Sequence, residues 1–132
     1  MLLTSGNVND CTMFTQVITG IRMPRPGARP WTRPRRVIAD KAYSTRAIRT
    51  YLRGRGIACT IPERRDQHAN RHQRGRAGGR PPTFDPITYR RRNVVERCFN
   101  RLKQYRAIAT RYDKTALSYQ GWLDLVTTLM WL

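Results

Sequence analysis

Residues 36–61 read RVIADKAYSTRAIRTYLRGRGIACTI, which is an apolar run, a helical pattern and a second apolar run. In the first run, residues 37–40, polar and apolar side chains do not alternate, which is typical of a strand buried on both faces. Ser44 is the expected N-cap of a helix that reaches about Arg53, where glycines follow. Residues 57–61 are the next expected strand. A strand, a helix and a strand in so short a stretch predict a βαβ unit and an α/β fold.

The residues before this unit predict one short helix and one loop. Residues 1–4 are expected to end a strand and residues 5–7 to form a turn. A helix should follow, capped by Asn9 or Asp10, because apolar side chains then recur at helical spacing up to residue 21. Residues 23–35 contain four prolines and are expected to form an extended loop.

The residues after the unit begin with a basic segment. Residues 62–84 are rich in arginine and glycine and predict a mobile loop, which is either a tolerated insertion or an arm that follows a phosphate backbone. The dipeptide Asp85-Pro86 then predicts the start of a helix that runs to about Tyr105. A last helix, over residues 116–132, is rich in apolar side chains and is expected to be a packing element.

The charge of the chain points to a polyanionic partner. Its 132 residues carry 26 Lys+Arg against 8 Asp+Glu, a formal net charge of +18. Most of these cations are arginine, and a GC-rich genome raises arginine usage without a functional cause, but a charge this large on a short chain favours nucleic acid. No apolar run approaches membrane-spanning length and no secretory signal is present. The three cysteines lie far apart, so we expect free thiols and a cytoplasmic protein.

The helix expected over residues 86–105 has two contrasting faces at about 100° per residue. One face should be buried, and it comprises Ile87, Val94, Val95, Cys98, Leu102 and Tyr105. The nearly opposite face carries Tyr89, Arg92, Glu96 and Lys103. Periodicity alone is equally compatible with a salt-bridged, solvent-exposed face.

Asp40 is the second notable acid, because it ends an apolar strand. Open α/β sheets place ligand-binding and catalytic groups at such strand ends, although an aspartate there also caps the following turn. A strand-end aspartate and a helix-borne glutamate that converge are suited to hold two Mg²⁺ ions for phosphoryl transfer on a polyanion.

The spacing of Tyr89, Arg92, Glu96 and Lys103 matches the Y-R-E-K signature of DDE transposases from bacterial insertion sequences. Nearly the whole chain resembles the insertion-sequence-five group of these enzymes. The resemblance is carried by residues 39–44 (ADKAYS), 78–82 (GGRPP), 92–103 (RNVVERCFNRLK) and 109–114 (ATRYDK).

This resemblance implies a ribonuclease H-like fold, with a mixed sheet and flanking helices, and two-metal cleavage and strand transfer of DNA with Mg²⁺ or Mn²⁺. Asp40 would be the second acid of the catalytic triad and Glu96 the third, both as metal ligands. Tyr89, Arg92 and Lys103 would hold the double-stranded DNA of the transposon ends.

One departure from the family concerns the first acid of the triad, which lies on the first strand in the family. Asp10 is a poor substitute, because it follows a turn and opens a helix. We therefore expect a C-terminal segment of the catalytic domain that lacks the first strands and is inactive alone. An N-terminal transposase polypeptide or a full-length transposase would complete it. The alternatives are a non-catalytic basic DNA-binding remnant and a basic RNA-associated protein.

Overall fold

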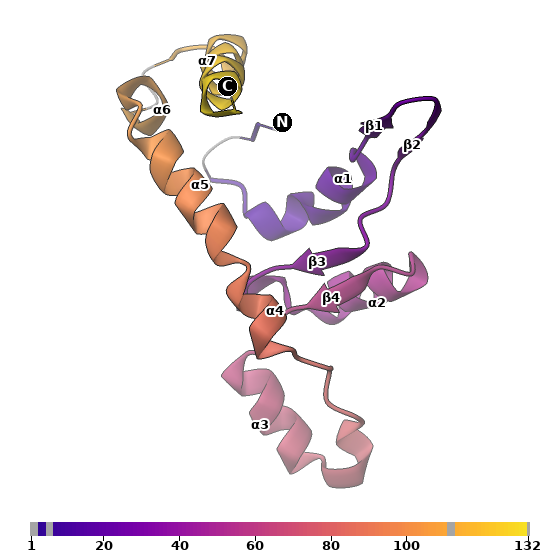
Figure 1. Cartoon of the computed structure of the whole chain (residues 1–132). Helices are drawn as coiled ribbons and strands as arrows, with labels where there is room; N and C mark the ends of the chain where they lie inside the picture. The colour runs from indigo at the N-terminus through magenta and orange to yellow at the C-terminus, as the bar shows by residue number, and fades with distance from the viewer. Residues whose placement is uncertain (1–2, 5–6, 111–112, 132) are drawn as a thin grey trace. The chain divides into compact units, whose positions relative to one another are not determined.

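The computed structural model describes residues 3–4, 7–110 and 113–131 (Figure 1). The chain divides into two compact units. We call residues 8–91 the central unit, and residues 1–7 with 92–132 the terminal unit. In the part of the chain that is described, no helix combines the length and the apolar character needed to cross a membrane.

The central unit contains helices, 3-10 turns and short strands. In chain order they are η1 (Asp10–Met13), α1 (Phe14–Thr19), β1 (Met23–Arg25), β2 (Ala28–Trp31), β3 (Arg36–Ile38), η2 (Lys41–Tyr43), α2 (Arg46–Gly54), β4 (Ala58–Thr60), α3 (Arg65–Gln73), η3 (Gly75–Gly78) and α4 (Pro86–Arg90).

The βαβ unit predicted from residues 36–61 is confirmed. Strands β3 and β4 pair in parallel, with Val37 opposite Cys59, and α2 is the connection between them. Side chains of α1, α2 and the residues flanking β4 share one core, which is formed by Phe14, Ile18, Ile48, Leu52, Ile57 and Ile61. The described residues are therefore mixed α/β, as predicted.

The predicted cap of α2 was wrong by one residue. Thr45, not Ser44, is the N-cap, and its hydroxyl accepts a hydrogen bond from the Ile48 backbone N–H at 3.3 Å. The 3-10 turn η2 follows Asp40 and delays the start of the helix. Ser44 is buried instead and bonds to Gln67 on α3.

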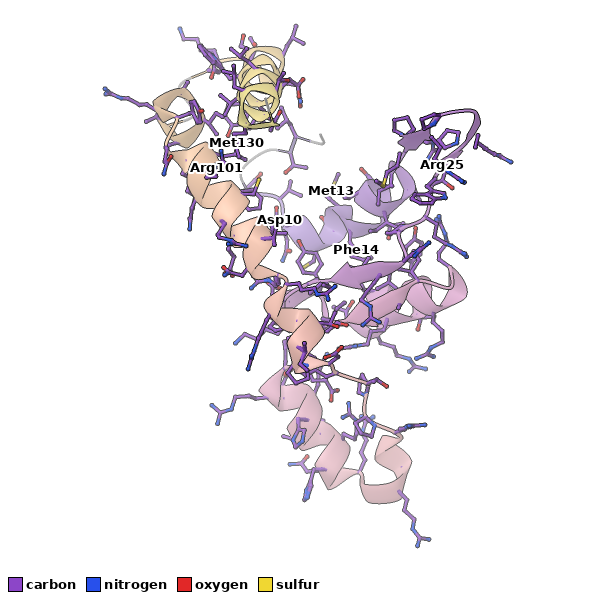
Figure 2. All side chains as sticks on the ribbon, viewed as in Figure 1. Asp10, Met13, Phe14, Arg25, Arg101 and Met130 are labelled. Atoms are coloured by element: carbon purple, nitrogen blue, oxygen red, sulfur yellow. The ribbon has the colours of Figure 1, made fainter. Side chains whose placement is uncertain are left out.

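A β-hairpin replaces the loop predicted over residues 23–35. Strands β1 and β2 are antiparallel, and Gly27 in the turn between them has a φ of 66°, a conformation that glycine adopts at no steric cost. The Arg25 guanidinium lies over the Trp31 ring, 4.8 Å from its centroid; Arg25 is labelled in Figure 2. Prolines in both strands lack the N–H that a further ladder needs. The described strands accordingly form two separate two-stranded sheets rather than one mixed sheet.

The predicted loop over residues 62–84 contains the helix α3 and the turn η3. Apolar side chains do not recur at helical spacing along α3, and none of its residues is buried. Hydrophobic periodicity therefore did not predict this helix. Its first turn is held by the side chain of Gln67, whose Oε1 accepts from the Arg64 backbone N–H at 3.2 Å. Polar capping, which periodicity does not reveal, therefore stabilises this helix.

The helix predicted over residues 86–105 is interrupted. Asp85 caps its start at Pro86 as predicted, but α4 ends at Arg90 and α5 (Asn93–Lys103) begins after a short turn. The break coincides with the boundary between the two units.

The regular secondary structure described in the terminal unit is helical. It comprises α5, α6 (Arg106–Thr110) and α7 (Ala116–Trp131), around a core of Leu102, Ile108, Leu123 and Val126. The predicted last helix is therefore confirmed up to Trp131, and Leu132 lies outside the described residues. Of the strand end and turn predicted over residues 1–7, residues 1–2 and 5–6 lie outside the described residues too. Residues 3–4 are not part of a strand, contrary to the prediction, and Leu3 packs against this core.

The buried stripe predicted along residues 87–105 was largely wrong. Leu102 is buried and Cys98 is half-buried, but Ile87, Val94 and Val95 are 75%, 58% and 52% exposed. Tyr105 is 39% exposed. Periodicity identifies the apolar side of a helix, whereas burial depends on which other element packs against that side.

Candidate functional site

Asp40 lies just beyond the C-terminal end of β3 in the central unit. The Ala39 N–H still bonds to the Thr60 carbonyl at 3.4 Å, so the parallel pair extends up to the residue before it. The half-buried carboxylate of Asp40 then caps η2, with Oδ1 accepting from the Ala42 N–H at 2.8 Å. Of the two interpretations left open by the sequence, capping is therefore observed. Capping and metal binding both use the ionised carboxylate, so the first does not exclude the second.

Asp10 and Asp40 both lie near Cys11 and Tyr43 in the central unit, and their charges raise the pKa of these two side chains. Burial raises the pKa of the Cys11 thiol, and the negative charges of Asp40 and Asp10 raise it further. The pKa of Tyr43 is raised by burial and then by Cys11, Asp10 and Asp40. Two acids thirty positions apart in the chain are thus brought near one thiol and one phenol. Sequence reasoning missed this, because it judged Asp10 only by its place in the chain.

This environment predicts the reactivity of Cys11. Only the thiolate is alkylated, and a raised pKa keeps the thiolate fraction low at pH 8. Replacing Asp40 by Asn removes a negative charge, so the pKa of Cys11 should fall and its reaction with iodoacetamide should accelerate. The rate is measured by mass spectrometry of the peptide that contains Cys11. Asp66→Asn, on the exposed side of α3, is the control and should change nothing; equal rates in Asp40→Asn and wild type would contradict the prediction.

Glu96 and Arg92 form an ion pair in the terminal unit. Arg92 precedes α5 and Glu96 is in its first turn, so their side chains are one helical turn apart. Arg92 Nη1 donates to Glu96 Oε1 at 2.7 Å, with the side chains 31% and 53% exposed. The salt-bridged interpretation of this face is therefore observed for the pair. An exposed pair adds little stability, and its consequence is to hold a carboxylate beside a guanidinium.

The other two residues of the signature occupy different settings. Lys103 is the exposed last residue of α5 in the terminal unit. Tyr89 is half-buried on α4 in the central unit, with its ring centroid 5.3 Å from that of Phe84. Of the five predicted site residues, the structure shows Arg92 and Glu96 in direct contact.

The acids supply oxygen donors of the kind that Mg²⁺ and Mn²⁺ prefer. Within the described ranges, however, no three side chains of His, Cys, Asp or Glu gather into a group that would hold a metal ion. Asp40 in the central unit and Glu96 in the terminal unit each supply a carboxylate of the kind that these ions bind.

A mixed α/β chain with a net charge of +18, an aspartate at a strand end and a glutamate on an arginine-rich helix has the features of a protein that acts on nucleic acid. Residues 1–131 match the family described as Transposase DDE domain, and the chain belongs to that family.

Two relatives are named as insertion-sequence transposases. The relative from Brucella ovis, named for insertion sequence element IS6501, is 28% identical over 98% of this chain and 84% of its own length. The relative from Burkholderia cepacia, named for IS402, is 34% identical over 94% of this chain, which spans about half (52%) of that protein. No solved structure matches the chain.

Proposed function

We propose that this chain supplies Asp40 and Glu96 to the catalytic site of an insertion-sequence transposase of the insertion-sequence-five group. The reaction is cleavage and strand transfer of DNA, carried out in the cytoplasm on double-stranded transposon ends. The observation that carries the proposal is the family match over residues 1–131, which includes both acids and the whole Tyr-Arg-Glu-Lys signature. A ribonuclease H-like arrangement of the complete domain is part of the proposal.

Asp40 and Glu96 would hold the divalent cations through their carboxylate oxygens. When bound, Mg²⁺ or Mn²⁺ would supply Lewis-acid chemistry for phosphoryl transfer. Arg92 keeps the Glu96 carboxylate in place through the 2.7 Å contact, and its cation, with that of Lys103, neutralises nearby phosphates. Tyr89 contacts DNA near the cut by stacking or hydrogen bonding.

The third carboxylate comes, in this proposal, from an N-terminal transposase polypeptide or a full-length transposase. A third carboxylate is part of the proposal because two carboxylates bind a divalent ion more weakly than three. The chain is accordingly expected to be inactive by itself and to act in a complex that contains the first acid of the triad.

The experiment mixes the full chain with an N-terminal transposase polypeptide and measures nicking of transposon-end DNA in Mg²⁺ or Mn²⁺. Glu96→Gln and Asp40→Asn should each lower the nicking rate at least about a hundredfold, because each removes a metal-holding charge, while DNA binding persists. Asp124→Asn, an exposed acid on α7, is the matched control and should nick at the wild-type rate. Unchanged nicking by Glu96→Gln would show that its catalytic assignment is wrong.

A second candidate function is non-catalytic DNA binding. It is favoured by the net charge of +18, which attracts DNA without any contribution from a catalytic acid. This alternative predicts that no mixture nicks DNA in either metal, although the chain still binds DNA and competes with an intact transposase for it.

A further inference from the structure

A basic groove lies between α2 and α3 in the central unit. It has a volume of about 510 Å³, and all of its lining residues come from positions 44–82. Six arginines and one acid, Glu63, line it; the arginines are Arg46, Arg49, Arg53, Arg71, Arg74 and Arg80. The lining therefore carries five more positive charges than negative ones. We call this feature the arginine groove.

The α2 wall of the arginine groove follows from helical spacing. Arg46, Arg49 and Arg53 are three and four positions apart, so they share one face of α2. Ile48 and Leu52 on the same helix are buried in the core, which fixes the direction of the arginine face. Figure 2 shows nitrogen-tipped side chains projecting from both α2 and α3.

The α3 wall is attached through a reciprocal pair of hydrogen bonds. The buried Ser44 hydroxyl donates to Gln67 Oε1 at 2.6 Å, and Gln67 Nε2 donates to the Ser44 carbonyl at 2.9 Å. Farther along, Gly78 packs so closely on the Arg71 backbone that an added Cβ would overlap the Arg71 carbonyl oxygen. The groove is thus built by specific contacts, although α3 has no buried residue.

Two of the six guanidiniums are engaged by these walls. Arg71 pairs with Glu63, which lowers the pKa of Glu63, and Arg49 Nη2 donates to the Ile61 carbonyl at 2.8 Å. The other four, on Arg46, Arg53, Arg74 and Arg80, make no side-chain hydrogen bond or ion pair with any residue that the structure describes. Each of them presents its donors to an incoming anion.

We propose that the arginine groove binds the sugar-phosphate backbone of DNA, as a contact additional to Tyr89, Arg92 and Lys103. The inference rests on the proposed action on DNA. Guanidinium forks match phosphate oxygens in geometry and charge, and several unpaired forks in one groove suit the closely spaced phosphates of a strand. Polar and charged side chains dominate the lining, so an apolar partner segment would gain little there.

The first test compares two double variants of the full chain that remove the same charge. Arg46→Gln/Arg53→Gln alters the groove, whereas Arg29→Gln/Arg65→Gln removes two exposed arginines that do not line it. Affinity for a duplex DNA is measured at several salt concentrations by fluorescence anisotropy. The groove variant should lower the slope of log affinity against log salt by about 2, since each phosphate contact contributes about 0.9. The control should keep the wild-type slope.

The second test uses a variant expected to act in the opposite direction. Glu63→Gln removes the only acid in the lining and keeps an amide oxygen for Arg71. Its affinity for the duplex should rise severalfold at low salt, a gain that partial unfolding does not produce. Circular dichroism of every variant checks that the helical content is retained.

Several results would overturn the inference. If the salt slope fell equally in both double variants, the loss would be a general effect of charge rather than of the groove. If the slope of the groove variant were unchanged, DNA would bind at a site other than the arginine groove. If the wild-type chain bound a duplex RNA of the same sequence more tightly than the DNA, the ligand of the groove would be RNA and the inference would be wrong. A wild-type chain that binds no DNA would overturn the proposed function as well, whereas intact binding with an unaffected groove variant would overturn the groove alone.

Discussion

Replacing Leu52 by alanine is expected to lower the free energy of unfolding of the central unit by about 2–5 kcal/mol. Leu52 lies on α2, is fully buried, and packs in the core with side chains from α1 and from both ends of β4. The substitution removes apolar contacts and leaves a cavity that the short elements around it fill only in part. A loss of this size is a large fraction of the stability of an ordinary domain.

The measurement is urea denaturation followed by circular dichroism. Leu117→Ala is the matched control, because Leu117 undergoes the same chemical change on α7 while 83% exposed. It should shift the stability by less than about 0.5 kcal/mol. Equal effects of the two substitutions would mean that the core around Leu52 does not stabilise the fold in solution.

Raising the salt concentration from about 50 to about 200 mM is expected to weaken DNA binding by about 10³- to 10⁵-fold, if 6–10 phosphates are contacted. The net charge of +18 makes such a number of contacts available. Each contact releases condensed counterions, and added salt opposes that release. The effect should be similar for any duplex, because it depends on phosphates rather than on bases.

The salt dependence is measured with a labelled duplex by anisotropy, and a second duplex of unrelated sequence is the control. A fall of less than about tenfold would correspond to no more than about two phosphate contacts. That result would show that most of the positive charge of this chain serves some purpose other than DNA binding.

Local signals in the sequence were sufficient for several parts of the fold. The apolar runs on either side of a helical pattern predicted β3, α2 and β4, because a crossover between short buried strands pairs them in parallel. Asp85 before Pro86 marked the start of α4 through capping chemistry contained within four residues. The apolar composition of residues 116–131 predicted the helix α7.

Part of the candidate site was also predictable. The position of Asp40 at the end of β3 follows from where the apolar run stops. The pairing of Arg92 with Glu96 follows from a spacing of four on a helix. The roles of these residues in catalysis stay predictions, which the nicking experiment addresses.

The elements that the sequence did not predict depend on contacts between distant positions. Helix α3 has no apolar stripe, and Gln67 secures it to Ser44 across 23 positions. The arginine groove exists because that attachment holds α3 beside α2. Likewise, Asp10 and Asp40 come near the same thiol, Cys11, only because α1 packs on the core. Along α5 the periodicity was present, yet most of the apolar face is exposed.

The sequence by itself therefore determined the βαβ unit, the capped helix starts, the cationic character and the family signature. The helix starts and the signature depend on residues a few positions apart, and the βαβ unit depends on three consecutive segments whose parallel pairing follows from the short crossover between them. The tertiary structure alone decided which helix faces are buried, which acids lie near Cys11 and which arginines line the arginine groove. Those outcomes depend on how separate elements pack, and packing is a property of pairs of segments rather than of either segment's own pattern.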